Sequence, residues 1–562
     1  MMEWWSSAAV ERPSHYSTTP SLHSVTGALA LVLHAHLPFV RHPECEFFHE
    51  ENWLFEAISE SYVPLLQMIR RLLRRGVRFK LTLSVSPTLC AMLGDPLLRD
   101  RYIRHLDLLI ALAERECERN RTEKSLLSLS EFYREFFAET RRTFVEEWDC
   151  DLLGVFRQLR GTGAVEIMAS AATHAILPIL QESPGAANAQ IAIGCDQFRE
   201  TFGGEPSGFW LPECAYSAGL AKSLQAENIR WFVVDAHAFE QAVPPARRGT
   251  FAPCFTRAGP AAFARDIQAS RQVWSAQQGY PGDPTYRDFY RDIGFDLSAK
   301  ELAPLPGNGF TGIKYHRVTG RDVAKQIYDR AAAEETARRH AHHFIERCVA
   351  ELQSLQADDW NPIMTVPFDA ELFGHWWFEG PIFLEHLILA AAENKLPLTT
   401  PSEFLEQNPT QQVTEPATSS WGDQGFLDVW LDQKCGWIYP HLLTANSRMT
   451  ALAKSRGREA RADDDRVLRQ LARELLLAQS SDWAFLIRNG TAKDYATQRV
   501  TVHLSRFQKL AEQFEKKKVD AEFLAQCEER DNLFPHVDWR RFLSLVIPRE
   551  VEDSLDILKK RK

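Results

Sequence analysis

Short apolar runs alternate with long amphipathic segments along most of the chain. The apolar runs occupy residues 29–37, 78–85, 165–169, 208–211, 230–235 and 363–368. Runs of this length, separated by helix-like segments, predict buried strands of a parallel sheet. Acids and histidines follow several runs at their carboxyl ends, so the pattern favours a TIM-like βα barrel over an open sheet.

The longer segments between these runs predict helices. Across residues 132–159, large apolar side chains recur every three to four positions, as on one face of a helix. The sequence therefore predicts a helical insertion around residues 91–160. Residues 396–419 are rich in Pro, Thr, Ser and Gln and predict a linker or surface loop. Beyond residue 439 the pattern becomes strongly helical.

These features predict the domain organisation. We expect a disordered leader over residues 1–27, which are rich in Ser, Thr and His and lack the basic and apolar regions of a secretion signal. A catalytic barrel follows over 28–410, and a mostly α-helical C-terminal domain over 411–562 contributes to the substrate site.

Composition narrows the class of partner. The 562 residues carry a formal net charge of −10, so no basic surface for nucleic acid is indicated. No apolar run is long enough to span a membrane. The ten cysteines form no Cys-x-x-Cys pair and are expected to be reduced. We therefore expect a cytoplasmic protein, and a monomer, without nucleic-acid or membrane partners.

Two acidic peptides carry the candidate chemistry. Glu213 follows a strand-like run beside Trp210, and Asp369 follows another, with Glu371 two positions later. Carboxylates framed by aromatic rings are typical of sugar chemistry, because rings stack on sugar faces and paired acids cleave glycosidic bonds. Taken alone, Glu213 could equally be a member of an ion pair or a nucleophile.

The neighbours of Asp369 favour an acid role for this residue. Pro367, Phe368 and Phe373 are expected to desolvate its carboxyl, and desolvation raises a carboxyl pKa, as a general acid requires. We expect Glu371 to orient His375 or a sugar hydroxyl instead.

Histidines and tryptophans add further candidates. His34 and His36 share one face of a strand, where they could be structural, contact sugar or bind metal, and the absence of a nearby third ligand lowers the metal option. His174 is informative only in combination with other residues. Trp421 and Trp430 lie in polar, glycine-containing sequence, so we expect both on a sugar-binding surface.

Together these peptides resemble glycoside hydrolase family 57 and its α-1,4-glucan branching members. Five family regions appear in order, at residues 34–38, 166–178, 208–214, 369–380 and 420–423. Further blocks typical of the branching members occur at 272–275, 280–283, 286–294 and 480–483. The resemblance extends over about residues 28 to 510.

The resemblance implies a fold and a set of site residues. The fold would be an incomplete (β/α)7 barrel with a helical insertion and a mostly α-helical C-terminal domain. Glu213 would be the nucleophile and Asp369 the acid/base of a retaining reaction that needs no metal or other cofactor. The implied substrate-binding residues are His34, His36, His174 and Asp235 at the donor subsite, Arg265, Gly282, Trp421 and Asp482 elsewhere, and Trp274 and Trp430 as stacking platforms.

The implied activity is α-1,4 cleavage of an α-glucan and transfer of the segment to a 6-hydroxyl, which forms an α-1,6 branch in glycogen biosynthesis. One departure concerns residues 236–250, which contain no tyrosine where branching members usually carry one on a mobile loop. An α-amylase-like hydrolase therefore remains an alternative. A non-catalytic glycan-binding protein and, more distantly, a metal-dependent polysaccharide deacetylase are alternatives of other kinds.

Overall fold

The computed structural model describes residues 26–275, 279–305, 309–320, 324–355, 359–457 and 461–543. The predicted leader, apart from its last two residues, lies outside this range. In the described part of the chain, no helix combines the length and the apolar composition needed to cross a membrane.

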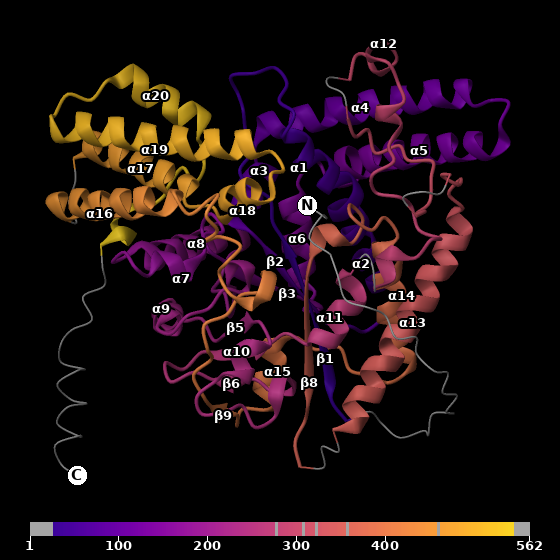
Figure 1. Ribbon diagram of the computed structural model, residues 1–562, viewed down its shortest axis with the longest axis horizontal. Helices are drawn as coiled ribbons and strands as arrows, with labels where there is room; N and C mark the ends of the chain where they lie inside the picture. The colour runs from indigo at the N-terminus through magenta and orange to yellow at the C-terminus, as the bar shows by residue number, and fades with distance from the viewer. Residues whose placement is uncertain are drawn as a thin grey trace.

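Seven parallel strands form the centre of the molecule (Figure 1). In spatial order they are β8 (Ile363–Asp369), β1 (Ala28–Ala35), β2 (Leu81–Val85), β3 (Val165–Ser170), β4 (Gly208–Trp210), β5 (Trp231–Val234) and β7 (Ala261–Ala264). The short strands β6 (Cys254–Phe255) and β9 (Gln412–Val413) extend the sheet beyond β7. The six predicted apolar runs did not include β6, β9 or the barrel strand β7.

The two outer parallel strands, β7 and β8, meet only where β7 ends. Arg265, directly after β7, forms an isolated parallel bridge with Thr365 of β8, and the Asp266 N–H donates to the Thr365 carbonyl at 2.8 Å. The predicted incomplete seven-stranded barrel is therefore confirmed. All eight residues of β1 are buried, which explains why this strand reads as a continuous apolar run.

Helices cover the barrel and form the predicted insertion. Between β1 and β2 lie α1 (Glu51–Ala57), the π-helical turn η1 (Ile58–Tyr62) and α2 (Val63–Arg74). Between β2 and β3 the chain forms α3 (Pro87–Leu93), α4 (Pro96–Arg119), α5 (Lys124–Arg142), the π-helical turn η2 (Thr143–Glu147) and α6 (Leu152–Gly161). Helices α4 and α5 pack together as a hairpin that projects from the barrel (Figure 1).

The remaining barrel connections are also mainly helical. They comprise α7 (Leu177–Leu180), α8 (Ala186–Phe202), η3 (Pro212–Cys214), α9 (Leu220–Ala226), α10 (His237–Glu240), η4 (Gly249–Phe251), α11 (Ile267–Trp274), η5 (Tyr280–Gly282), η6 (Ile293–Phe295), α12 (Ala299–Leu302), α13 (Arg330–Ser354), η7 (Ala370–Leu372) and α14 (Gly380–Glu393). Helices α13 and α14 pack against each other beside the barrel.

Residues 396–419, predicted as a linker or surface loop, pack along the barrel and are helical or extended in two short stretches. The segment contains α15 (Pro401–Gln407) and β9, and Glu415 and Ser419 then form bridges with Val243 and Tyr216. Backbone pairing holds much of this polar segment in place, and Phe404 and Leu405 of α15 pack into the core. This pairing leads the chain back to the carboxyl end of β4.

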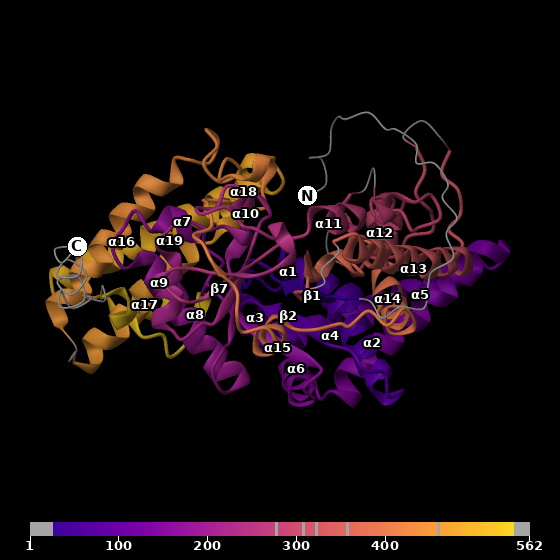
Figure 2. The same cartoon turned by 90° about the horizontal axis from the view of Figure 1, so that it is seen from below.

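After η8 (Asp423–Gly425) the chain forms the predicted helical C-terminal region. It comprises α16 (Ile438–Arg456), α17 (Ala462–Ala478), α18 (Ser481–Asn489), α19 (Lys493–Glu515), α20 (Ala521–Arg530) and η9 (Trp539–Phe542). These helices lie on the side of the barrel opposite the α4–α5 hairpin (Figures 1 and 2). The start of α18 reaches the carboxyl ends of the strands, where it meets His174.

Candidate active site

The two candidate acids occupy the carboxyl ends of different barrel strands. Glu213 lies in η3 directly after β4, where its backbone adopts a left-handed conformation with φ of 61°. Asp369 is the last residue of β8 and pairs in register with His34 of β1. Both side chains are half-buried. Strained backbone at a strand end often marks a residue held for function.

The two acids differ in their surroundings. Burial, followed by the negative charges of Glu371 and Glu213, raises the pKa of Asp369 well above its usual value. Burial raises the pKa of Glu213 to about 7, but a hydrogen bond from Trp421 opposes this rise. These surroundings favour a protonated Asp369, whereas the Trp421 hydrogen bond makes Glu213 easier to ionise than burial alone would allow. A retaining glycosidase needs this division of roles.

Trp421 binds Glu213 through both side chain and backbone. Its indole Nε1 donates to Glu213 Oε2 at 2.7 Å, and its backbone N–H donates to the Glu213 carbonyl at 2.9 Å. The ring also lies edge-on to Trp210 and to Trp274, with centroids 5.0 and 6.0 Å away. The segment predicted as a linker therefore delivers a direct partner of the candidate nucleophile.

Three histidines stack beside the acids. His34 Nε2 lies 2.9 Å from His174 Nε2, and the His36 and His174 rings stack at 3.7 Å. Burial, then the neighbouring histidines, lowers the pKa of both His34 and His174 well below the usual value. A hydrogen bond between two Nε2 atoms requires that one ring accepts, which fits neutral imidazoles. His174 Nδ1 lies 3.9 Å from Glu213 Oε1.

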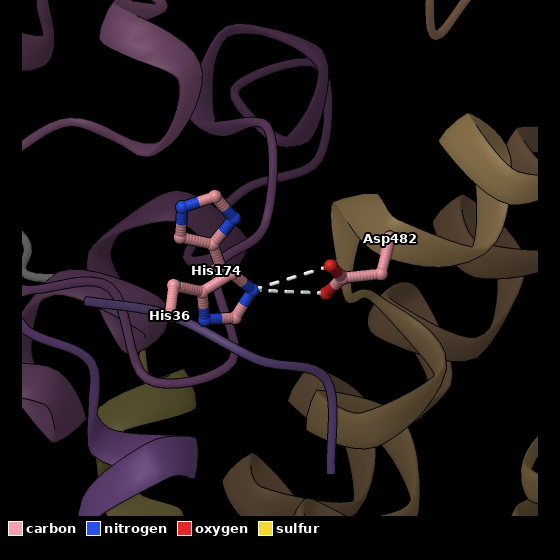
Figure 3. A group of neighbouring side chains, drawn as sticks. All are labelled: His36, His174 and Asp482. Carbon is pink, nitrogen blue, oxygen red and sulfur yellow. Dashed lines mark hydrogen bonds and ion pairs between the residues drawn. The ribbon is translucent and has the colours of Figure 1, made fainter. Parts of the chain in front are cut away.

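The C-terminal region contributes Asp482, near the start of α18. Figure 3 shows its carboxylate facing His36, with Nε2 to Oδ2 and Oδ1 distances of 3.1 and 3.3 Å. Burial alone would raise the pKa of Asp482, but His36, His174 and the Ser480 hydrogen bond together lower it to about 2. Asp482 is therefore a carboxylate at any ordinary pH, and it ties the helical region to the barrel.

His36, His174 and Asp482 are close enough together to hold one metal ion. However, all four ring nitrogens of His36 and His174 already have hydrogen-bond partners in the protein. His36 Nδ1 bonds Ser86 Oγ at 2.8 Å, and His174 bonds His34 through Nε2 and Ser481 Oγ through Nδ1 at 2.9 Å. Because these hydrogen bonds account for the geometry, the trio does not fit a resident metal, and the prediction of a metal-free reaction is kept for test.

Asp235 and Arg265 follow neighbouring strands β5 and β7 and form an ion pair. Asp235 also accepts from His237 Nδ1 at 2.9 Å. Burial would raise the pKa of Asp235, but the His237 hydrogen bond, followed by the Arg265 charge, holds it below the usual value. The Arg265 guanidinium lies over the Trp421 ring at 5.9 Å, so this charged pair adjoins the candidate nucleophile's partner.

Among the other predicted residues, Trp274 is half-buried and close to both Trp421 and Trp376, so it belongs to the same aromatic group. Gly282 ends the short helix η5 and is half-buried. The expectation of an exposed Trp430 is wrong. Its side chain is 1% exposed and packs against Gly422, which leaves no free face for a sugar.

Of the two expected partners of Glu371, His375 is wrong, and a sugar hydroxyl stays a prediction. Glu371 accepts hydrogen bonds from the Tyr62 hydroxyl and from the backbone N–H of His36, whereas His375 binds Glu60. Sequence reasoning missed Tyr62 and Glu60, because both precede the acidic peptide by about 300 positions and lie inside an ordinary helical pattern. It also missed His237, although its spacing of two from Asp235 was visible.

Two family descriptions cover most of the chain. Residues 30–417 match "Glycosyl hydrolase family 57", and residues 441–542 match "1,4-alpha-glucan branching enzyme, C-terminal". The first match spans the barrel and the second spans the helices that supply Asp482.

Individual relatives agree along almost the whole chain. A 1,4-alpha-glucan branching enzyme of Thermococcus kodakarensis is 33% identical over 94% of this chain and 80% of its own length. The crystal structure of alpha-amylase AmyC from Thermotoga maritima is 40% identical, with a TM-score of 0.87, and covers 93% of this chain and 100% of its own. The crystal structure of a branching enzyme from Pyrococcus horikoshii is 34% identical, with a TM-score of 0.83, and the match covers 93% of this chain and 98% of that one. The chain belongs to glycosyl hydrolase family 57, as its sequence motifs predicted.

Proposed function

We propose that the chain is a 1,4-α-glucan branching enzyme that works by retaining double displacement. The observation that supports this most directly is the placement of both acids around one histidine pair. Asp369 pairs in register with His34, His34 bonds His174, and His174 Nδ1 lies 3.9 Å from Glu213 Oε1. The match of residues 441–542 to the branching-enzyme C-terminal family supports transfer in particular. The same region supplies Asp482, which contacts His36 of the barrel.

In the first step, the Glu213 carboxylate attacks the anomeric carbon of an α-1,4 link while Asp369 gives its proton to the leaving oxygen. A covalent glucosyl–enzyme forms with inverted configuration, and the rest of the glucan leaves with a free 4-hydroxyl. In the second step, Asp369 takes the proton of a 6-hydroxyl on another glucan segment. That oxygen displaces Glu213, which restores the α configuration and creates an α-1,6 branch.

The remaining site residues have binding roles in this proposal. His34, His36, His174 and Asp235 line the donor sugar, Arg265, Gly282, Trp421 and Asp482 hold the glucan, and Trp274 supplies a stacking ring. The histidines and the Asp235–Arg265 pair are held by hydrogen bonds or ion pairs before substrate arrives. Preorganised groups of this kind reduce the cost of orienting the sugar.

Hydrolysis is the second candidate, and two observations favour it. The alpha-amylase AmyC resembles this chain at 40% identity. Residues 236–250 contain no tyrosine and, in the structure, form α10, a surface turn and η4, with Phe239 buried. If water reaches the glucosyl–enzyme before a 6-hydroxyl does, the segment is released with a new reducing end, so water exclusion decides the outcome.

Incubation with amylose separates the two activities. Branching creates one new α-1,6 link, detected as chains released by a debranching enzyme, without a net gain in reducing ends. Hydrolysis gives one new reducing end for each cleavage. We expect mostly α-1,6 links, and a product dominated by new reducing ends would reject branching.

Two controls test the remaining alternatives, a non-catalytic glycan-binding protein and a metal-dependent deacetylase. Glu213→Gln should lose turnover on the order of 10⁴-fold while it still binds amylose. Unchanged turnover in that variant would reject the proposed chemistry, and binding without any turnover in the wild-type chain would favour a glycan-binding protein. Full activity after exhaustive chelation would exclude the metal-dependent deacetylase.

The cellular setting and the chain's organisation belong to the same proposal. We place the activity in glycogen biosynthesis in the cytoplasm and expect a monomer, with a barrel over 28–410 and a C-terminal domain over 411–562. Gel filtration tests the oligomeric state. Glycogen branching in cells that lack the protein tests the pathway.

A further inference from the structure

We propose that Tyr62 is a positioning residue for the reaction: its hydroxyl, held by a π-helical turn, keeps the Glu371 carboxylate charged beside Asp369, and that charge keeps the proton on Asp369. The inference rests on the proposed role of Asp369 as acid/base. It adds a residue that neither the sequence motifs nor the family match assigns.

The π-helical turn η1 (Ile58–Tyr62) packs on the segment that follows β8. Three successive side chains bind this segment. Glu60 accepts from His375 Nδ1 at 2.7 Å, Ser61 Oγ accepts from the His375 N–H at 3.0 Å, and the Tyr62 hydroxyl donates to Glu371 Oε1. A π-turn widens a helix by one residue, and such turns are frequent at functional sites.

The contact between Tyr62 and Glu371 is shielded from water. Tyr62 is 2% exposed and Glu371 is 4% exposed. Glu371 Oε1 also accepts from the backbone N–H of His36 at 3.1 Å, so two donors converge on one carboxylate oxygen. A buried carboxylate keeps its charge only when donors replace the lost water. Among the described residues, Tyr62 supplies the one side-chain hydrogen bond to the Glu371 carboxylate oxygens.

The charge on Glu371 acts on Asp369, two residues earlier. After burial, Glu371 is the largest cause of the raised pKa of Asp369, ahead of Glu213. Burial raises the pKa of Glu371 itself to about 7, and the Tyr62 hydrogen bond is the strongest influence that opposes this rise. Burial and the charge of Glu371 raise the pKa of Tyr62 well above its usual value, so its hydroxyl remains a donor.

Other charged groups face the same contact. The described groups that act on these three residues are Glu213 after β4, His36 after β1 and Cys90 of α3, while Glu60 of η1 is engaged by Arg287 and His375. These groups stay in place in a Tyr62→Phe chain, because none of them depends on the phenol hydroxyl for a hydrogen bond.

The direction of the effect follows from these contacts. Without the Tyr62 hydroxyl, the pKa of Glu371 rises and a larger share of Glu371 is neutral near pH 7. A neutral Glu371 no longer repels a charge on Asp369, so Asp369 loses its proton at lower pH. The basic limb of the pH profile of kcat/KM, which reports loss of the general acid, therefore moves toward acid.

The test compares pH profiles of total α-1,4 cleavage for Tyr62→Phe, Glu371→Gln and the double variant. We expect the basic limb to move toward acid by about 1 pH unit in Glu371→Gln and by less in Tyr62→Phe. The double variant should match Glu371→Gln alone, because Tyr62 acts through Glu371. An unmoved limb in Tyr62→Phe, or additive shifts in the double variant, would overturn the proposal.

Tyr102→Phe is the matched control. Tyr102 is equally buried and its hydroxyl bonds Ser59 Oγ of the same π-turn at 2.9 Å, away from Glu371. It should lose thermal stability as Tyr62→Phe does, yet keep the wild-type pH profile. If Tyr62→Phe behaves like this control in every respect, Tyr62 is merely structural.

A spectroscopic readout separates this proposal from the proposed function. Infrared difference spectra against Asp369→Asn report the protonated carboxyl of Asp369 whether or not the chain branches glucan. We expect this band to persist to higher pH in the wild type than in Tyr62→Phe. Equal titration in both would reject the role of Tyr62, whereas a shifted titration with no α-glucan cleavage would reject only the proposed function.

Discussion

Trp421 donates its indole N–H to Glu213 Oε2 at 2.7 Å, and its backbone N–H to the carbonyl of the same residue. This double contact joins a segment after the barrel to the candidate nucleophile. Since an indole can only donate, Trp421 favours the ionised form of Glu213.

Trp421→Phe should therefore shift the acidic limb of the pH profile to higher pH. The pKa of Glu213 is raised to about 7 by burial even with the hydrogen bond, and its loss raises that pKa further. As pH is lowered, Glu213 in the variant therefore takes up a proton, and activity falls, at a higher pH than in the wild type. We expect kcat/KM of the variant near pH 6 to be about tenfold below that of the wild type. Trp231→Phe, which removes an indole bond to Ser402 Oγ, should leave the profile in place.

Asp482→Asn should weaken both stability and glucan binding. The folded-state pKa of about 2 lies below the usual 3.8, so the carboxylate stabilises the fold above about pH 4, and this contribution disappears as pH falls toward 2. We expect unfolding free energy to drop by about 1–3 kcal/mol at pH 7, because His36 loses its charged partner. Urea titrations of the wild type and Asp482→Asn at pH 7 and pH 3 check this expectation. If the two proteins differed in unfolding free energy by the same amount at both pH values, the role of the Asp482 carboxylate would be contradicted.

Phe426→Ala should increase the share of hydrolysis. Phe426 is 43% exposed and lies edge-on to His237 at 5.5 Å, beside the partner of Asp235. Removal of this ring admits water near the glucosyl–enzyme, so new reducing ends per α-1,6 link should rise several-fold. Val413→Ala removes an exposed side chain on β9 and serves as the control. An unchanged ratio in Phe426→Ala would assign water exclusion elsewhere.

Gly374→Ala should disrupt the segment that follows β8. Gly374 has a φ of +122°, and a Cβ there would lie 1.8 Å from the Glu60 carbonyl oxygen. We expect a loss of about 3 kcal/mol or more, measured by thermal unfolding, together with loss of activity. Gly76→Ala also places alanine at positive φ but meets no atom within 4 Å, so it should cost only about 1 kcal/mol.

The sequence predicted the features that depend on local pattern. Alternation of apolar runs and amphipathic segments predicted the barrel, and the carboxyl ends of those runs placed Glu213 and Asp369 at strand ends, where the structure has them. It could not predict that Trp430 is buried, because polar neighbours in sequence do not reveal what packs over a ring. Tyr62 and Glu371 are 309 positions apart, and no local pattern connects them.

Trp421 and Asp482 follow all seven parallel strands of the barrel in sequence, and this order has a consequence for protein synthesis. A ribosome that has released β1 to β8 has made both acids, but neither the indole that supports Glu213 nor the carboxylate that pairs with His36. The nascent barrel thus lacks a finished site until α18 emerges and docks. We therefore expect cleavage of glucan to begin only after α18 has been made.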